Sequence, residues 1–272
     1  MIKLMKRTFW KIFWCFFLVL WKCIPLRRKA LLLEQEPLHG ALDWDRSVLL
    51  SVSSLQDIRR LRAAGSEPYT ARWIAEDMRD GDCLYDIGAS VGAYSFIAAR
   101  AHKNITIYAF EPSAASFASL LANIARNGCG ARVIPLSVAL GERTGFTTFI
   151  YASLFSGATK QHGIKGVGAL SDTRQVVYAW ALDDLIVGAK LAPPTHIKID
   201  VDGSEIMVML GMLKTLAFPS VRLVQVEASQ GKEGTAGTIS EILTGAGFVL
   251  AETNRADNFR ATDYLFRRAS VI

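Results

Sequence analysis

The stretch Cys83-Leu-Tyr-Asp-Ile-Gly-Ala-Ser-Val-Gly92 decides the fold of this 272-residue chain. Its apolar beginning predicts a buried strand, and the small residues after Gly92 predict a helix directly behind a glycine turn. The two glycines let backbone N–H groups approach a ligand closely. A second apolar run ends on Glu111, twenty-five residues after Asp86, and an acidic side chain at this offset accepts hydrogen bonds from ribose hydroxyls. The stretch therefore predicts a nucleoside cofactor site.

The glycine spacing separates two cofactor classes. Dinucleotide-binding turns usually read Gly-x-Gly-x-x-Gly, which brings the backbone close to a pyrophosphate. Here the turn begins on Asp86 and has only Gly88 and Gly92. Because a carboxylate repels a pyrophosphate and attracts an ammonium or sulfonium group, the turn favours S-adenosylmethionine over NAD. The alternative interpretation is a turn that serves only tight packing between strand and helix.

The rest of the body alternates between strand and helix patterns, which predicts an α/β fold with a mostly parallel sheet and helices on both faces. Residues 34–80 are predicted to be mostly helical, with Pro68 in a first turn. A glycine-rich insertion at 141–182 is predicted to be a hairpin with a long loop, and His162 in that loop is interpreted as a solvated residue. The predicted strands are 83–87, 105–110, 132–136, 147–151, 175–180, 195–201, 221–227 and an antiparallel edge pair at 248–252 and 262–266, and the predicted helices are 93–101, 113–127, 205–216 and 237–244.

The net charge of +6 is concentrated at the amino terminus. The first 33 residues hold eight Lys and Arg and no acidic residue, so subtracting 8 from +6 leaves −2 on the remainder. The body is therefore not basic, and its charge gives no support for nucleic-acid binding. The four cysteines form no Cys-x-x-Cys pair and lie at no metal-like spacing from a histidine, which indicates reduced packing thiols and no metal site.

The basic leader, residues 1–33, is also aromatic. Three tryptophans recur at helical spacing among its cations, which predicts a helix that binds an anionic membrane surface through residues 8–30. The uncharged run from Ile12 to Trp21 covers only ~15 Å as a helix, about half of a ~30 Å hydrocarbon core. A short or tilted span, a cleaved signal peptide and a helix packed on the protein's own core are the alternatives.

A second group of charged residues follows a later strand, in His196-Ile-Lys-Ile-Asp-Val-Asp-Gly-Ser-Glu205. Because carboxyl ends of parallel strands meet at one edge, we expect Asp200, Glu205 and Glu227 to converge with the acids of the glycine turn. Asp200 is the first candidate for a general base, Glu227 the second and His196 the third, since its place in the strand pattern predicts burial.

Two other interpretations of the same group stay open. One is purely structural, a helix cap formed by Asp202 or Ser204 beside a Lys198–Asp200 ion pair. The other is a set of grouped carboxylates that holds a divalent cation. The sequence alone does not separate them.

With these residues in view, the chain resembles the FkbM family of S-adenosylmethionine-dependent methyltransferases. The resemblance covers roughly residues 66–267, and its motifs occur in family order. It implies a class I methyltransferase fold, Rossmann-like, with a seven-stranded sheet, in a domain at 81–272. The matching motifs are Asp86-Ile-Gly-Ala-Ser-Val-Gly92, Ala109-Phe-Glu-Pro112, Val138-Ala-Leu-Gly141, Ala181-Leu-Asp-Asp184, Ile197-Lys-Ile-Asp-Val-Asp-Gly-Ser-Glu205 and Val226-Glu227.

The resemblance also implies a map of the cofactor site. The methionine end falls to the glycine turn, the ribose to Glu111 beside Pro112, and the adenine to Ser137 and Val138. Asp200, Glu205 and Glu227 are then expected to line the cleft. Two residues depart from the family pattern, because Ser90 stands for an Asn in the turn and Asp202 for a Glu after the strand. The residues assigned to the turn are Asp86, Gly88, Ser90 and Gly92.

The implied activity is O-methylation of a hydroxyl on a sugar, glycolipid or natural product. A membrane-bound leader favours a glycan or lipid-linked acceptor, and use of S-adenosylmethionine favours the cytoplasmic face of the membrane. The alternatives are a membrane-associated adaptor that keeps the fold without the reaction, and a dinucleotide-dependent reductase.

Overall fold

The computed structural model describes residues 22–25, 28, 38–150, 156, 173–229, 235–255 and 261–269. The chain has two compact units, residues 1–38 and residues 39–272. Nearly all of the aromatic leader lies outside the described residues, so the membrane-binding helix stays a prediction. Within the described residues, no helix has the length and apolar character that crossing a bilayer requires.

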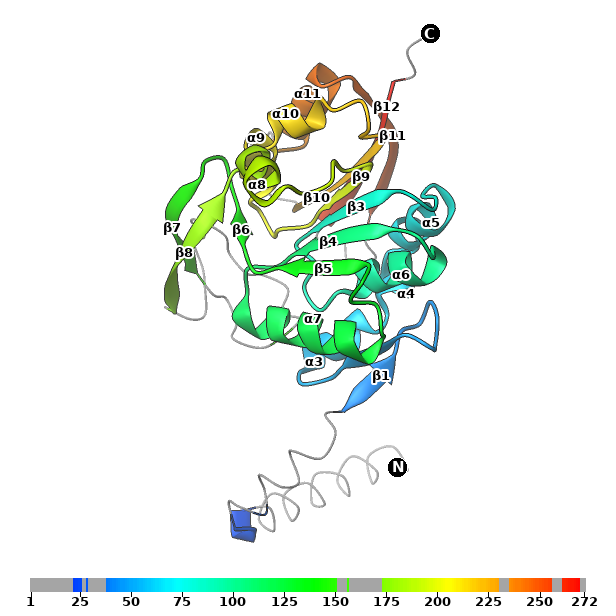
Figure 1. Ribbon diagram of the computed structural model, residues 1–272, viewed down its shortest axis with the longest axis vertical. Coiled ribbons are helices and arrows are strands. Elements are labelled where there is room, and N and C mark those ends of the chain that lie inside the picture. The colour runs from blue at the N-terminus through cyan, green and yellow to red at the C-terminus, as the bar shows by residue number, and fades with distance from the viewer. Residues whose placement is uncertain are drawn as a thin grey trace, which may run out of the picture. The chain divides into compact units, whose positions relative to one another are not determined.

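A seven-stranded sheet in the order β11-β12-β10-β9-β3-β4-β5 forms the centre of the second unit (Figure 1). β12 is antiparallel to both of its neighbours, and the remaining pairs are parallel. The mostly parallel sheet and the antiparallel edge pair are therefore confirmed. The strands are β3 (Cys83–Ile87), β4 (Thr106–Phe110), β5 (Val133–Leu136), β9 (His196–Ile199), β10 (Leu223–Ser229), β11 (Phe248–Arg255) and β12 (Ala261–Arg268).

Helices cover both faces of this sheet, so the central strands β3 and β4 are almost entirely buried. Along β3, Leu84 belongs to one buried cluster and Tyr85 and Ile87 to the other, because successive side chains point to opposite faces. Figure 1 shows α5 to α7 on the first face and α8 to α11 on the second. The bounds are α5 (Pro68–Glu76), α6 (Ala93–Ala101), α7 (Ala114–Arg126), α8 (Leu182–Ala189), α9 (Glu205–Leu210), α10 (Leu213–Leu216) and α11 (Thr235–Gly245).

The segment before the sheet is less helical than predicted. It begins with an antiparallel hairpin, β1 (His39–Ala41) and β2 (Leu49–Ser51), and continues through α3 (Leu55–Arg60) and α4 (Ala63–Ser66). Pro68 does occupy the first turn of α5. The hairpin is held from far away, since the backbone N–H groups of Leu49 and Ser51 donate to the side-chain carbonyls of Asn127 and Asn123 in α7. A local pattern does not reveal such partners.

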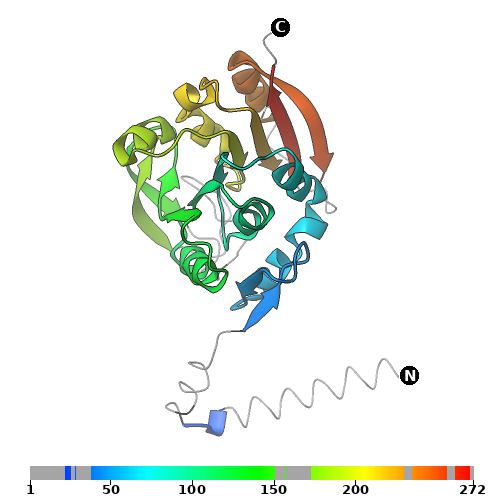
Figure 2. The ribbon, with the colours of Figure 1, turned by 45° about the vertical axis from the view of Figure 1, so that its right-hand side comes forward.

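The insertion forms a small second sheet in the order β6-β8-β7. β7 (Gly145–Ile150) and β8 (Arg174–Trp180) pair as the predicted antiparallel hairpin, and the short β6 (Ala139–Leu140) adds to β8. Figure 2 shows this hairpin on the opposite side of the unit from β11 and β12. The loop that contains His162 lies outside the described residues.

The helix predicted at 205–216 is divided into α9 and α10. The break falls at Gly211, where a Cβ atom would lie 2.0 Å from the carbonyl oxygen of Gly141. The side chain of Asp183 then receives the N–H groups of Lys214 and Thr215 at the start of α10. Two short helices therefore replace the continuous helix: Gly211 packs closely against the backbone of Gly141, and Asp183 caps the start of α10 from a distant part of the chain.

Candidate active site

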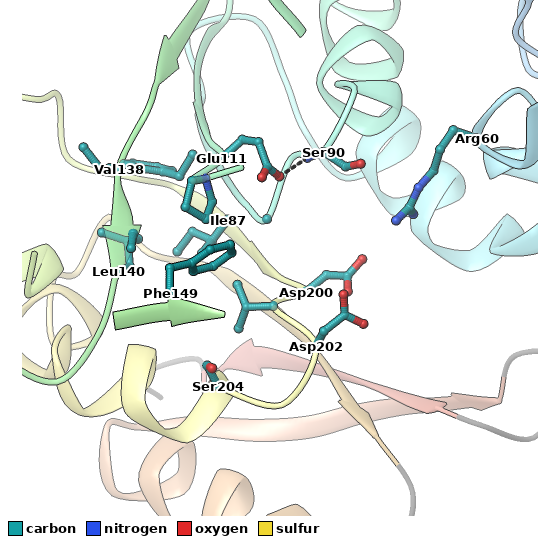
Figure 3. A pocket seen from close by; sticks show the side chains of 15 residues that line it. Arg60, Ile87, Ser90, Glu111, Val138, Leu140, Phe149, Asp200, Asp202 and Ser204 are labelled. Carbon is teal, nitrogen blue, oxygen red and sulfur yellow. Dashed lines mark hydrogen bonds between the residues drawn. The ribbon is translucent and has the colours of Figure 1, made fainter. Parts of the chain in front are cut away.

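A pocket opens at the carboxyl ends of β3, β4 and β9, where an open α/β sheet binds its ligands (Figure 3). About 700 Å³ of space lies between its walls, and this figure includes open solvent. Apolar side chains form one wall and acidic side chains the other. The pocket is lined by Arg60, Ile87, Gly88, Ser90, Phe110, Glu111, Pro112, Val138, Ala139, Leu140, Phe149, Asp200, Val201, Asp202 and Ser204.

The glycine turn between β3 and α6 is tied to both neighbouring strands. The N–H groups of Gly88 and Ala89 donate to the carbonyl of Phe110, and the N–H of Asp200 donates to the carbonyl of Ile87. Gly88 has φ +84°, and a Cβ atom there would lie 1.8 Å from the carbonyl oxygen of Asp200. Only glycine fits this close approach, which brings the turn directly against the end of β9.

Ser90 and Gly92 also adopt left-handed backbone conformations, with φ of 53° and 92°. Gly and Asn adopt this conformation more readily than Ser, so the Asn of the family pattern suits position 90 better than the Ser present here. Gly92 precedes α6 and packs against the side chains of Leu120 and Phe96. Ser90 lines the pocket, whereas Gly92 acts through the shape of the turn.

Glu111 lies on the pocket wall, directly after β4, and the backbone fixes its orientation. One carboxylate oxygen accepts from the N–H of Ser113 at 2.7 Å and the other from the N–H of Ser90 at 2.8 Å. Each oxygen keeps a lone pair for a ligand hydroxyl. Burial raises the pKa of Glu111 to about 7, although both hydrogen bonds act in the opposite direction.

Asp86 lies behind the pocket wall, on none of the lining positions. It is 1% exposed, and its Oδ2 accepts from the hydroxyl of Ser95 at 2.6 Å. Its Oδ1 has no hydrogen-bond partner in the part of the chain that the structure describes. Burial raises the pKa of Asp86, while the ammonium group of Lys198 opposes this. Asp86 therefore supports the turn from behind the pocket wall through its contact with Ser95.

Asp200 follows β9 and forms the charged floor of the pocket. Its Oδ2 lies 3.0 Å from Nζ of Lys198, whose ammonium group also lies 4.7 Å from the ring centre of Tyr94. Burial alone would raise the pKa of Asp200, but the positive charges of Lys198 and Arg60 hold it at about 2. Lys198 is 2% exposed and stays charged, because the neighbouring carboxylates raise its pKa.

Glu227 is the protonated partner of Asp200. The charge of Asp200 and then burial raise the pKa of Glu227 to about 11, and the carboxyl group donates its hydrogen bond to Asp200. Two carboxyl groups this close cannot both ionise, so one proton is shared between them over the physiological range. Glu227 thus lies beside the pocket rather than on its wall.

The structure separates the remaining predicted residues. Pro112 and Val138 line the pocket, whereas Ser137 is exposed and does not. Glu205 does not line it either, because it is 3% exposed and its Oε1 accepts from the N–H of Gly203. Asp202 lines the pocket with φ +53°. The predicted convergence therefore holds for Glu111 and Asp200 and not for Glu205.

His196 lies at the wrong end of its strand for catalysis in this pocket. It is the first residue of β9, and its ring stacks on Trp73 with centroids 5.9 Å apart. Its Nδ1 lies 2.9 Å from Oγ1 of Thr195. Burial lowers the pKa of His196 to about 4, so the ring is neutral at physiological pH. The third candidate base is a core residue, separated from Asp200 by the length of β9.

The sequence analysis gave no site role to several lining residues, among them Arg60, Phe110, Leu140 and Phe149. Phe110 belongs to a predicted strand, and its apolar type gave no functional signal. Arg60 lies in a segment without a ligand-binding pattern. Among the described residues, no three His, Cys, Asp or Glu side chains are grouped to hold a metal ion.

A comparison with known families identifies the family of the chain. The model of the methyltransferase FkbM domain matches residues 86–250. The chain belongs to the FkbM methyltransferase family. It is therefore a methyltransferase, and S-adenosylmethionine is its expected cofactor. The reductase and the non-catalytic adaptor are the less favoured interpretations.

Two curated methyltransferases are similar in sequence to this FkbM-family chain. Hexuronic acid methyltransferase AglP of Haloferax volcanii is 28% identical over 181 residues, which cover 66% of the chain and 70% of the relative. The 31-O-demethyl-FK506 methyltransferase FkbM of Streptomyces tacrolimicus is 30% identical over 201 residues, which cover 65% of the chain and 76% of the relative.

Solved structures are more distant. A methyltransferase FkbM from Methylobacillus flagellatus is 14% identical with a TM-score of 0.49, and the match covers 68% of the chain and 43% of that protein. The TYW2 protein of M. jannaschii, solved in complex with AdoMet, is 12% identical with a TM-score of 0.46, over 86% of the chain and 88% of that protein.

Proposed function

We propose that this methyltransferase transfers a methyl group from S-adenosylmethionine to a hydroxyl oxygen of a small-molecule, glycan or lipid-linked acceptor. The observation that carries the proposal is the ionised carboxylate of Asp200, held at the pocket floor by Lys198. An acceptor hydroxyl loses its proton during methylation, so a fixed carboxylate within hydrogen-bond reach is the group that the reaction requires.

The chemistry of the lining residues supports S-adenosylmethionine as the ligand of this pocket. Phe110, Val138 and Leu140 provide an apolar wall for adenine, and Glu111 provides carboxylate oxygens for the ribose hydroxyls. The close approach of Gly88 to the backbone of Asp200 fixes the turn beside the end of β9, where the methionine end of the cofactor is proposed to lie. When bound, the cofactor supplies an electrophilic methyl group on a positively charged sulfur. Asp86, Gly92 and Ser137 remain proposed members of the site that act through the shape and charge of its walls.

The Asp200–Glu227 pair explains how the proton is handled. Glu227 keeps its proton and uses it to donate a hydrogen bond to Asp200. Asp200 therefore stays ionised and keeps one oxygen edge for the acceptor. A neutral hydroxyl becomes strongly acidic as its oxygen gains the methyl group, and even a carboxylate with a low pKa then accepts the proton. Asp200 is thus the proposed base, and Glu227 positions it.

Two conservative variants test these roles. Asp200→Asn is expected to keep its affinity for S-adenosylmethionine in calorimetry and to lose about 10²–10⁴-fold in turnover. Glu227→Gln resembles the protonated side chain and is expected to retain most of the turnover. Turnover is followed by transfer of a labelled methyl group. Parent-like turnover of Asp200→Asn excludes Asp200 as the base. If only Glu227→Gln loses turnover, Glu227 is the base and Asp200 the positioning residue.

The acceptor class is proposed from the names of the relatives. One name gives a hexuronic acid as substrate and the other an O-demethylated compound, so both are oxygen-rich molecules that favour O-methylation. Uronic acids, neutral sugars and hydroxylated macrolides are therefore the first acceptors to assay. Transfer to amines and not to any hydroxyl or carboxyl compound would refute this part of the proposal.

Membrane association through residues 8–30, at the cytoplasmic face, is proposed from the composition of the leader. The full chain is expected to float with vesicles that contain anionic phospholipid, and the binding is expected to weaken at high salt. Deletion of residues 1–30 is expected to abolish flotation without loss of methyl transfer to a soluble acceptor. Equal flotation of both forms would refute the anchor.

A further inference from the structure

Arg60 is a cation at the pocket whose charge helps to lower the pKa of Asp200, but the proposed reaction gives it no ligand of its own. It ends α3 and lies outside the region that matches the FkbM domain. Its guanidinium group lines the pocket, and Figure 3 shows it extending toward the side where Ser90, Asp200 and Asp202 lie. In the part of the chain that the structure describes, its Nε is buried without a hydrogen-bond partner. A buried charged donor without an acceptor is costly, so a bound ligand that supplies the acceptor would complete the site.

The position of Arg60 is fixed by a chain of hydrogen bonds. Ser54 and Asp57 form a capping box at the start of α3, and Asp57 is fully buried. The preceding hairpin is tied to Asn123, whose Oδ1 accepts from the N–H of Ser51. The Nδ2 of the same Asn123 donates to the carbonyl of Val91 in the glycine turn. One side chain of α7 therefore connects the segment that carries Arg60 to the turn that carries Ser90.

The order of groups along the pocket gives the ligand a direction. Figure 3 shows Val138 and Leu140 at one end, Glu111 in the middle, and Ser90 and Arg60 toward the other end. An adenosine with its base on the apolar wall and its ribose at Glu111 extends its 5′ substituent toward Arg60. The hydroxyl of Ser90, which lines the same stretch, also has no hydrogen-bond partner among the described residues.

We propose that Arg60 binds the methionyl carboxylate of S-adenosylmethionine, with the hydroxyl of Ser90 as a second donor. The inference rests on the proposed cofactor site and names its carboxylate subsite. Guanidinium and carboxylate groups match in geometry and charge, which makes arginine suited to this contact. Asp200 and Asp202 surround the same end of the pocket with negative charge, so a carboxylate needs this cation to approach.

The test compares two nucleosides that differ at the carboxylate end. S-adenosylhomocysteine carries the amino-acid group, and 5′-methylthioadenosine lacks both its amine and its carboxylate. For Arg60→Gln in the full chain, calorimetry is expected to show about 10–100-fold weaker binding of S-adenosylhomocysteine and binding of 5′-methylthioadenosine within twofold of the parent. Arg60→Lys keeps the charge and is expected to recover part of the loss.

Arg59→Gln is the matched control. Arg59 is the exposed neighbour on the same helix, its guanidinium group donates to Oε1 of Gln56, and it does not line the pocket, so both affinities are expected to stay at the parent level. An equal melting temperature for all variants establishes that the fold is retained.

The remaining outcomes overturn the inference in distinguishable ways. Parent-like binding of S-adenosylhomocysteine by Arg60→Gln refutes it, and a raised KM for an acidic acceptor in that variant assigns Arg60 to the acceptor's carboxylate instead. An equal loss for both nucleosides shows that Arg60 supports the site as a whole. If the parent binds neither nucleoside, the cofactor proposal itself fails and the inference fails with it.

Discussion

Replacement of Gly88 by alanine tests whether the close contact between the glycine turn and β9 forms the cofactor site. Gly88 has φ +84°, and a Cβ atom there would lie 1.8 Å from the carbonyl oxygen and 2.8 Å from the carbonyl carbon of Asp200. Both are backbone atoms, so no side-chain rotation relieves the contact. Gly81 offers a matched control, because it has φ +93° and no atom within 4 Å of such a Cβ.

The difference between the two variants isolates the steric term. A left-handed conformation costs an L residue about 1–2 kcal/mol, so Gly81→Ala is expected to lose about that much free energy of unfolding. Gly88→Ala has the same backbone penalty and an overpacking cost of about 1–3 kcal/mol in addition. The total is about 2–5 kcal/mol, and relief of the contact moves the turn away from Asp200 and Glu111.

Urea denaturation measures the stability term, and calorimetry with S-adenosylmethionine measures the functional one. Gly88→Ala is expected to be less stable than Gly81→Ala and to bind the cofactor more weakly, while Gly81→Ala keeps parent-like affinity. If Gly88→Ala were no less stable than the control and bound the cofactor like the parent, the role of this contact in shaping the site would be refuted.

Three further predictions follow from the same region. Glu111→Ala is expected to abolish measurable cofactor binding in calorimetry, and parent-like affinity would remove Glu111 from the ribose site. Asn123→Ala leaves the N–H of Ser51 and the carbonyl of Val91 unpaired, so it is expected to lose about 2–3 kcal/mol in urea denaturation, and a loss below about 0.5 kcal/mol would contradict the link. Glu227 is protonated in the folded chain up to about pH 11 but ionises near pH 4.5 when unfolded, so the parent's stability is expected to fall as pH rises through this window. Glu227→Gln should flatten that dependence, and equal slopes for both proteins would disprove the raised pKa.

The central strands were predictable because local and long-range requirements agree there. The bounds of β3 and α6 match the sequence prediction residue for residue, since an apolar run, a glycine turn and a run of small residues each carry the signal needed. The same holds for Glu111 and Asp200, because parallel strands place their carboxyl ends at one edge. Topology alone brings these two residues together.

The errors arose where a residue depends on distant partners. The β1–β2 hairpin is held by Asn123 and Asn127 of α7, and the break between α9 and α10 comes from the carbonyl of Gly141. His196 carried a chemical group but lies at the amino end of β9, where its ring stacks on Trp73. Lys198 is buried in the sheet because its ammonium group pairs with the carboxylate of Asp200 at the end of the same strand.

The antiparallel strand β12 sets the smallest piece of this protein that can be stable by itself. It lies between β10 and β11 and comes from residues 261–268, beyond the region that matches the FkbM domain. A fragment limited to 86–250 would leave one edge of β10 without its neighbour and would invite intermolecular strand pairing. It would also lack Trp73, whose indole donates to Gln225 of β10. The matched region 86–250 is thus shorter than the sheet of this chain, and expression trials should begin no later than His39 and continue through Arg268.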